Sequence, residues 1–567
     1  MTRTARHLAH LLGSAALCVG APALAQVGST PPAGIPTSGV SNDVPTTASA
    51  PTSAERDREP RRRRVTVEPY VEVGQILTAE LGGTGDVLTY STLAAGVDAT
   101  IATPRAQGAA SVRYERRFGW GRANDANILS AALRGNYAVT RNLSIEGGAI
   151  ATRASLDGGR GSPEFGLVTG TPVSDIYSVY AGPSYVARYG DLTFAAAYRL
   201  GYSASRLDAP LPVGAVPLAR FSDAVTHNAL LSTGMRPGRL PFGWTSTTSW
   251  EREDAGQLDQ RYDGLSTRLD LVFPVSPTVA VVGGVGAERI EVSYRPPLLN
   301  PATGTPQVDA DGRYVTDSAA PRRIAFDTSG LIWDAGVLWR PSRRMSLEAR
   351  VGRRYDDWSY TGSWSFQPND RTAYRLGVYD RIGTVGRGLT SAVAGLPTDF
   401  GVVRNPIDGS FSGCLFGSQD AQCLTPLLGN LTGLAYRNRG AILTASQQRR
   451  DWTFGVALGY DNRDYLDESG GLLAALAGEE ETWFASLSAA RQLDERTGLG
   501  SSLFWQYYDG SATNGDAFSA GANVALSRQF WRGLTGQAAL GLNMIDARGF
   551  NTRYYASALL GLRYSFQ

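Results

Sequence analysis

The feature that most limits how this chain can fold is an alternation of apolar with small or polar residues, repeated from Val65 to Phe566. Within Leu192–Ser203, every second residue beginning at Leu192 is apolar, and the residues between them are small or polar. Trp452–Asp461 and Ser359–Gln367 repeat the pattern. A period of two places alternate side chains on opposite faces of a β-strand. The alternation therefore predicts an all-β chain.

The composition excludes several classes of protein. Glycine accounts for 66 of 567 residues, and charged residues for 19% against a usual value of about 25%. The net charge is only +2, with no lysine in the chain, which argues against a nucleic-acid binder. Three cysteines and three histidines are too few for a zinc cluster or a disulfide-rich scaffold. We therefore expect no nucleic-acid partner, no metal and no cofactor.

The N-terminus has the pattern of a secretory signal peptide. Two arginines precede the apolar stretch Leu8–Val19, and the small residues Ala23 and Ala25 form a cleavage site after residue 25. Residues 26–64 are rich in Pro, Ser, Thr and Arg and have no apolar period, so we expect a disordered periplasmic leader. The remaining domain would then be residues 65–567, exported from the cytoplasm.

Alternating strands also form soluble β-sandwiches, so the two faces of the strands decide the class. Aromatic residues lie near strand ends on the apolar face, as in the girdles of transmembrane barrels: Trp333, Trp339, Trp452, Tyr460, Tyr554 and Phe566. The polar face carries charges that a dry core would hold only at high cost, but that a wet lumen accommodates. The candidate lumen charges are Arg113, Glu115, Arg117, Arg199, Arg268, Asp270, Glu348, Arg350, Arg354, Arg375 and Arg381.

Short turns alternate with long loops along the chain. The long loops are Asp157–Asp175, Leu207–Ala224, Arg295–Ser329 and Gly386–Asn438. Short periplasmic turns and long extracellular loops are typical of transmembrane barrels. The sequence therefore predicts an antiparallel up-and-down β-barrel of about 22 strands, with 18 or 20 as alternatives, surrounded by outer-membrane lipid.

The last strand ends in aromatic residues on its apolar face. Tyr564 and Phe566 resemble the C-terminal signal that the barrel assembly machinery reads, although Gln567 follows Phe566. This resemblance predicts that the machinery is a partner during insertion into the cell outer membrane.

Four segments resemble a narrower family. Residues 70–81 followed by 86–90, and residues 113–120, 177–183 and 375–381, are similar to outer-membrane β-barrel porins associated with the exosortase (PEP-CTERM) and exopolysaccharide systems. The resemblance implies a conduit in polysaccharide export, with polysaccharide and periplasmic export components as partners. A general or solute-specific uptake porin, and a structural or adhesive barrel without transport, stay open as alternatives.

The chain offers little for catalysis, and we expect no enzyme. His227 is the one histidine beyond the signal peptide, and the apolar neighbours on its face predict that it points outward. No nucleophile elbow, P-loop or Rossmann pattern occurs. Cys414 and Cys423 lie in the longest loop and are expected to form a disulfide, because the export route is oxidising.

A barrel of this size has a wide lumen that must be narrowed. The leader, residues 26–64, is too short for the folded plug of a large nutrient transporter, which disfavours a TonB-type transporter. We therefore expect Gly386–Asn438 and Arg295–Ser329 to fold inward or arch over the mouth. The lumen arginines predict a weak preference for anions, unless acidic neighbours such as Glu115 and Glu348 pair with them.

Overall fold

The computed structural model describes most of the chain beyond residue 63. The described residues are 64–81, 87–157, 160–162, 173–207, 221–309, 313–400, 404–407, 409, 413–417, 421–428, 431–466, 478–510, 516–548 and 551–566. All of them belong to the compact unit Pro36–Gln567. The expected signal peptide and nearly all of the expected leader lie outside the described residues.

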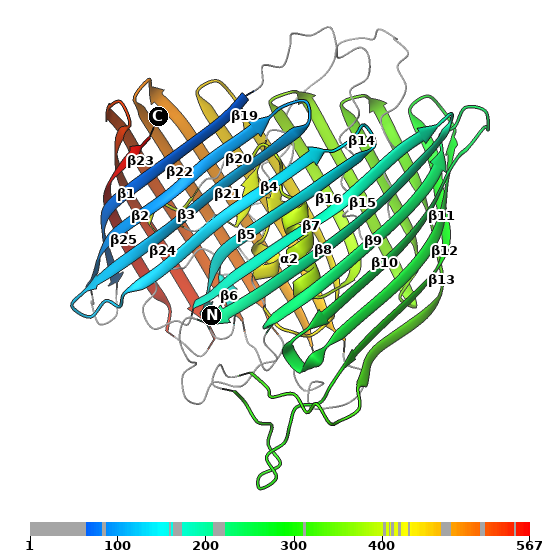
Figure 1. Cartoon of the computed structure of the whole chain (residues 1–567), viewed down its shortest axis with the longest axis horizontal. Helices are drawn as coiled ribbons and strands as arrows, with labels where there is room; N and C mark the ends of the chain where they lie inside the picture. The colour runs from blue at the N-terminus through cyan, green and yellow to red at the C-terminus, as the bar shows by residue number, and fades with distance from the viewer. Residues whose placement is uncertain are drawn as a thin grey trace, which may run out of the picture. The chain divides into compact units, whose positions relative to one another are not determined.

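The dominant element is one antiparallel sheet that closes on itself (Figure 1). Its strands are β1 (Arg64–Leu81), β2 (Val87–Ala102), β3 (Ala106–Trp120), β4 (Ala126–Ala138), β5 (Leu143–Asp157), β6 (Arg160–Ser162), β7 (Val173–Tyr189), β8 (Leu192–Leu207), β9 (Asp223–Met235), β10 (Gly243–Ala255), β11 (Arg261–Pro274), β12 (Val279–Tyr294), β13 (Arg323–Ser342), β14 (Met345–Arg354), β15 (Asp357–Asn369), β16 (Thr372–Gly383), β19 (Tyr436–Gln448), β20 (Trp452–Tyr465), β21 (Glu479–Asp494), β22 (Thr497–Asp509), β23 (Ala517–Trp531), β24 (Leu534–Ala547) and β25 (Arg553–Ser565).

Each wall strand pairs with its neighbour in sequence, and β1 pairs with β25 to close the ring. The short β6 only extends a hairpin with β5, so the wall formed by the described residues has 22 strands. The predicted fold class and the count of about 22 are therefore confirmed, and the alternatives of 18 and 20 are wrong. The segments near Val225, Leu331 and Gly440 are full wall strands.

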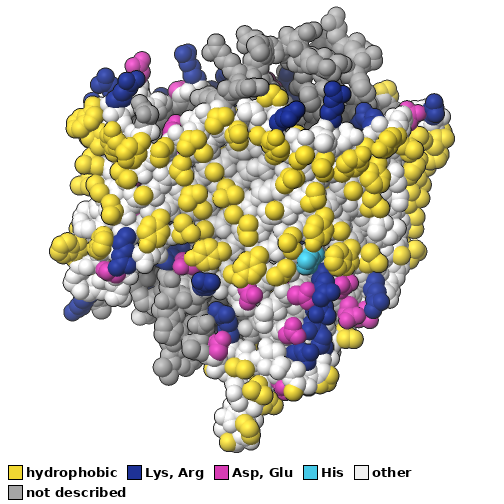
Figure 2. Space-filling model, viewed as in Figure 1, with side chains coloured by type: hydrophobic (Ala, Val, Ile, Leu, Met, Phe, Trp, Pro, Cys, Tyr) yellow, Lys and Arg dark blue, Asp and Glu magenta, His cyan; other side chains and the backbone are white. Residues whose placement is uncertain are grey.

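The alternation predicted from sequence sets which side chains face outward. On β25, Tyr554, Leu560 and Tyr564 are exposed, whereas Tyr555 and Leu559 between them are buried. Figure 2 shows outward apolar side chains in a broad band across the face of the wall in view. An apolar exterior over a polar interior is the arrangement of a barrel that sits in lipid. None of the described helices is long and apolar enough to cross a membrane.

The loop between β12 and β13 forms a projecting arm. Its backbone pairs with itself through the bridges Pro297↔Thr316, Leu299↔Pro306 and Val308↔Tyr314, and it projects beyond the strand ends (Figure 1). The described residues of Arg295–Ser329 therefore do not fold inward, as one form of the prediction had it; the other form, that the segment arches over the mouth, stays a prediction. The physical reason is that much of the arm's backbone pairs within the arm, while Leu299 and Val308 stay exposed.

Candidate functional site in the barrel lumen

The connection between β16 and β19 enters the lumen. This lumen segment, residues 384–435, contains the helix α2 (Val385–Ala394), the hairpin of β17 (Cys414–Phe416) and β18 (Ala421–Cys423), and the short helix α3 (Thr425–Leu428). Helix α2 contacts β5, β7, β8, β9 and β10, and Figure 1 shows it within the ring of strands. The prediction that Gly386–Asn438 folds inward is confirmed.

Two wall carboxylates hold the start of α2. Glu253 on β10 accepts hydrogen bonds from the Thr384 hydroxyl at 2.6 Å and from the backbone N–H of Arg387 at 2.7 Å. The Arg387 guanidinium pairs with Glu251 and lies 3.9 Å from the ring centroid of Tyr262. A carboxylate at a helix N-terminus meets the unpaired N–H groups and the positive end of the helix dipole. The wall thus supplies the cap that the helix lacks in its own sequence.

Small residues let the helix lie directly on the wall. A Cβ atom on Gly386 would come within 2.6 Å of Ala224 Cβ, and a Cβ atom on Gly201 within 2.5 Å of the Thr390 methyl group. The Thr390 hydroxyl lies 3.1 Å from the Thr226 hydroxyl. Glycine at these positions is therefore needed for close approach of the helix to the wall.

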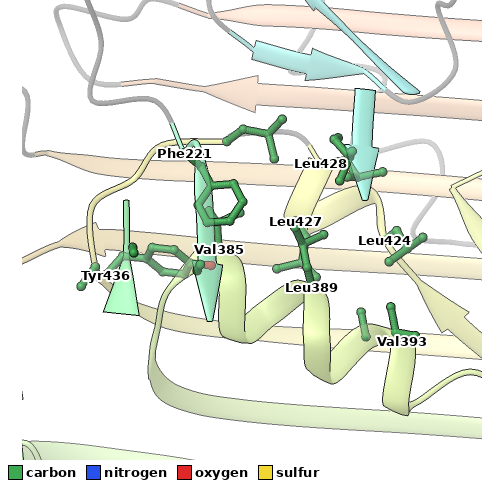
Figure 3. Packing of buried hydrophobic residues seen from close by; sticks show 14 of the residues in the cluster. Phe221, Val385, Leu389, Val393, Leu424, Leu427, Leu428 and Tyr436 are labelled. Atoms are coloured by element: carbon green, nitrogen blue, oxygen red, sulfur yellow. The ribbon is translucent and has the colours of Figure 1, made fainter. Parts of the chain in front are cut away.

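An apolar cluster joins α2 and α3 to the wall (Figure 3). Leu389 and Val393 are completely buried, and Leu428 of α3 packs in the same cluster with Phe221 and Tyr436 from the wall ends. Burying one leucine side chain contributes about 1.5–3 kcal/mol. The lumen segment therefore has a hydrophobic core of its own, shared with the wall.

The middle of the lumen segment reaches a second part of the wall. The Arg404 guanidinium donates hydrogen bonds to the hydroxyls of Ser111, at 2.9 Å, and Ser130. Arg117 donates to the Ile407 carbonyl at 3.1 Å. Burial lowers the pKa of Arg404 to about 10, so it still carries its charge at neutral pH. The positively charged side chain of Arg404 thereby attaches the lumen segment to β3 and β4.

The hairpin β17–β18 reaches a third part of the wall. Cys414 and Cys423 are joined by a disulfide, as the sequence predicts. Phe416 lies over Gly455 of β20, where a Cβ atom would come within 2.7 Å of its ring, and packs with Phe484 of β21. Because the segment contacts β3–β4, β5–β10 and β20–β21, it crosses the lumen from wall to wall.

The structure places the predicted lumen charges inside the barrel, and most of them are paired. Arg350 bridges Asp270 at 2.7 Å, Asp334 at 3.0 Å and Glu348 at 2.6 Å. Further ion pairs join Arg113 to Glu72 and Glu115, Arg117 to Glu115, Arg199 to Glu146, Arg268 to Asp270 and Asp334, and Arg354 to Glu288. Arg375 and Arg381 are half-buried on β16. Pairing neutralises much of the positive charge on which the predicted anion preference depends.

Sequence reasoning missed the acidic partners Glu72, Glu146, Glu251, Glu253 and Glu288. Each lies on the same strand face as the small or polar residues around it, which is the signal that could have found it. What the strand pattern does not give is the register between strands, which decides the partner of each acid.

His227 lies on the outer surface, where the sequence predicts it. Its Nδ1 is 2.7 Å from the Tyr198 hydroxyl, and its ring centroid is 6.1 Å from that of Trp250. Figure 2 shows the histidine on the outer face, at the edge of the apolar band. Its neighbours are those of an aromatic girdle.

A small cavity lies between the lumen segment and the wall. A cavity of about 30 Å³ is lined by Ser249, Tyr262, Glu288, Arg354 and Arg387, among others. A cavity needs roughly 10–15 Å³ to hold one water molecule, so this one accommodates about two. In the described residues the lumen segment therefore leaves room for water there, but not for a sugar or a chelate.

Comparisons with known proteins do not assign a family. No family model matches the chain, and no curated protein matches it. The resemblance to the exopolysaccharide-associated porins therefore stays a prediction. Solved structures that it is similar to include the FrpB iron transporter of Neisseria meningitidis (10% identity over 87% of this chain and 81% of that one, TM-score 0.42). The copper transporter OprC (12%, 90% and 82%, 0.39) and the ferric-catecholate receptor Fiu of E. coli K12 (12%, 90% and 82%, 0.42) are others.

Proposed function

We propose that this protein is an outer-membrane channel for the uptake of small solutes, closed at rest by its lumen segment. The observation that carries the proposal is the contact of residues 384–435 with β3–β10 along one arc of the wall and with β20–β21 on another. The apolar outer band and the short turns on one side support a place in the outer membrane. Paired charges around a polar lumen suit the passage of water-soluble molecules.

Removing the lumen segment tests this proposal. Gly383 pairs with Tyr436 across β16 and β19, so a short Gly-Ser turn replacing residues 385–434 would join two adjacent strand ends. We expect the single-channel conductance in planar bilayers to rise several-fold, because the polypeptide that fills the lumen is gone. Deleting residues 297–316 of the projecting arm is the matched control and should leave the conductance unchanged.

An unchanged conductance after removal of residues 385–434 would reject the channel and favour the structural or adhesive barrel. Export of exopolysaccharide, which the sequence resemblance implies, would require the lumen segment to clear a path for a polymer chain. Nothing in the described lumen favours that cargo over a small solute. Loss of secreted polymer in a strain that lacks the protein would nevertheless replace the uptake proposal with the export one.

A further inference from the structure

The end of the barrel that carries the short turns is basic. Ten turns join the described strands there, and they contain eleven arginines: Arg105, Arg141, Arg236, Arg239, Arg343, Arg344, Arg371, Arg449, Arg450, Arg496 and Arg532. The same turns contain four acidic residues: Asp191, Asp370, Asp451 and Glu495. Exposed charges at the adjoining strand ends do not reverse the balance, since they are Arg188, Arg491 and Arg528 against Glu68 and Asp494. We call this ring of turns the basic rim.

Much of the positive charge of the basic rim has no acidic partner. Arg239 pairs with Asp191 at 3.1 Å. Five other arginines are exposed and make no ion pair or side-chain hydrogen bond with another described residue: Arg105, Arg141, Arg371, Arg450 and Arg532. Arginines at the opposite, long-loop end differ, because Arg116 pairs with Asp125 and Arg289 with Glu291. The charge of the basic rim is therefore available to a partner outside the chain.

Aromatic side chains point outward next to the basic rim. Tyr189 and Trp531 each end a wall strand and are 66% and 65% exposed. Arg532 follows Trp531 directly, and Arg449 Cζ lies 5.5 Å from the ring centroid of Trp452. Figure 2 shows dark-blue side chains along the upper edge of the wall, beyond the apolar band. Tyrosine and tryptophan lie at the headgroup level of a bilayer, so the neighbouring guanidinium groups reach the level of the lipid phosphates.

The distribution of the arginines indicates the kind of partner. They occur in eight of the ten turns, and only the turns between β7 and β8 and between β11 and β12 have none. A docked protein would need positive charge on one side of the rim only. Lipid surrounds the whole wall, so a charge spread around the ring suits the lipid.

We propose that the basic rim binds the headgroups of anionic phospholipids in the leaflet that the short turns face. Short turns of transmembrane barrels lie on the periplasmic side, so this is the periplasmic leaflet. A guanidinium donates paired N–H groups to phosphate oxygens, and basic clusters beside a membrane span attract anionic lipid. The inference concerns the outside of the wall and does not rest on the proposed channel.

The test compares two lipid probes that differ in headgroup charge. The full chain is reconstituted in phosphatidylcholine bilayers at low salt. Electron paramagnetic resonance then measures how much spin-labelled phosphatidylglycerol or phosphatidylcholine is immobilised at the wall. We expect the wild-type protein to favour phosphatidylglycerol at least about threefold, because the exposed arginines attract its charge. The preference should disappear at about 1 M salt, where exposed charges are screened.

The rim variant removes four arginines whose side chains contact no described acid: Arg141→Gln, Arg371→Gln, Arg450→Gln and Arg532→Gln. Its preference for phosphatidylglycerol should fall below about 1.5-fold. The matched control removes the same charge from the opposite end, where each arginine is paired with an acid: Arg116→Gln, Arg252→Gln, Arg261→Gln and Arg289→Gln. The control should keep the wild-type preference.

Three results would overturn the inference. Equal immobilisation of the two probes by the wild-type protein would do so and would favour an acidic protein or polymer as the partner of the basic rim. An unchanged preference in the rim variant, or an equal loss in the control variant, would also do so. The salt series needs only the wild-type protein and so does not depend on folding of the variants; a preference that persists at about 1 M salt is the third such result.

Discussion

At the scale of single residues, Glu253 holds the start of the lumen segment against the wall. Its carboxylate accepts both the Thr384 hydroxyl and the Arg387 N–H. Glu253→Ala should reduce the free energy that holds α2 against the wall by roughly 1–3 kcal/mol, because two buried donors lose their acceptor. Hydrogen exchange of the backbone amides of residues 387–394 is the measurement, and we expect it to accelerate at least about fivefold. Glu253→Gln retains an acceptor oxygen and should show a smaller change; equal protection in both variants would contradict the capping role.

Gly201 provides a steric test of the same contact. Gly201→Ala would place a methyl group 2.4 Å from Thr226 Oγ1 on β9 and 2.5 Å from the Thr390 methyl group of α2, so we expect α2 to shift away from the wall. We expect this variant to raise the single-channel conductance or the frequency of openings. Gly135→Ala on β4 is the control, because the nearest atom to its added methyl group lies 3.9 Å away. If the two variants conduct alike, close packing of α2 on the wall does not keep the channel closed.

The inward-facing residues of the wall show what the sequence alone can predict. Alternation predicts which side chains face inward, because a strand fixes that by its period. It does not predict that Arg350 meets Asp270, 80 positions earlier, or that Arg134 and Arg199 share Glu146. Those partners follow from the register of neighbouring strands, which only the closed sheet determines.

At the scale of elements, the sequence predicts the structure of the lumen segment least well. Its length and position in sequence indicate an inward fold, but α2 has glycine at Gly386 and Gly388 and no side-chain cap of its own. A helix of 10 residues is marginal in water, so its stability must come from tertiary contacts that the local pattern does not contain. The alternation within each wall strand predicts that strand. The structure of the enclosed lumen segment depends instead on its contacts with the wall.

The hairpin β17–β18 gives the element-scale prediction. The disulfide between Cys414 and Cys423 closes a short loop and holds Phe416 over Gly455. Replacing both cysteines by serine should destabilise the hairpin by about 2–3 kcal/mol, since the open chain gains conformational entropy. We expect faster proteolytic cleavage between residues 413 and 424, read by mass spectrometry, and the same cleavage in reduced wild-type protein. Resistance equal to that of the oxidised protein would mean that packing of Phe416 alone holds the hairpin.

At the scale of the whole molecule, the barrel depends on one seam between the two ends of the chain. Strand β25 pairs with β1 from Tyr70↔Ser565 to Leu81↔Tyr554, and the N–H of Phe566 donates to the Pro69 carbonyl at 2.9 Å. Among the described wall strands, every other backbone pairing joins strands that follow one another along the chain. Closure of this seam is therefore the long-range step, and an open edge would expose unpaired backbone groups to lipid.

Removing residues 564–567 should therefore prevent closure. The truncation deletes the aromatic pair Tyr564 and Phe566, whose rings lie 5.1 Å apart, together with one end of the seam. We expect most of the heat-resistant folded species to be lost from the outer-membrane fraction, because lipid offers no partner to the freed backbone of β1. Removing Gln567 alone leaves the paired residues intact and should preserve the folded species. If the longer truncation accumulates as folded barrel to the same level, neither the end of the seam nor the terminal aromatic residues are required for insertion.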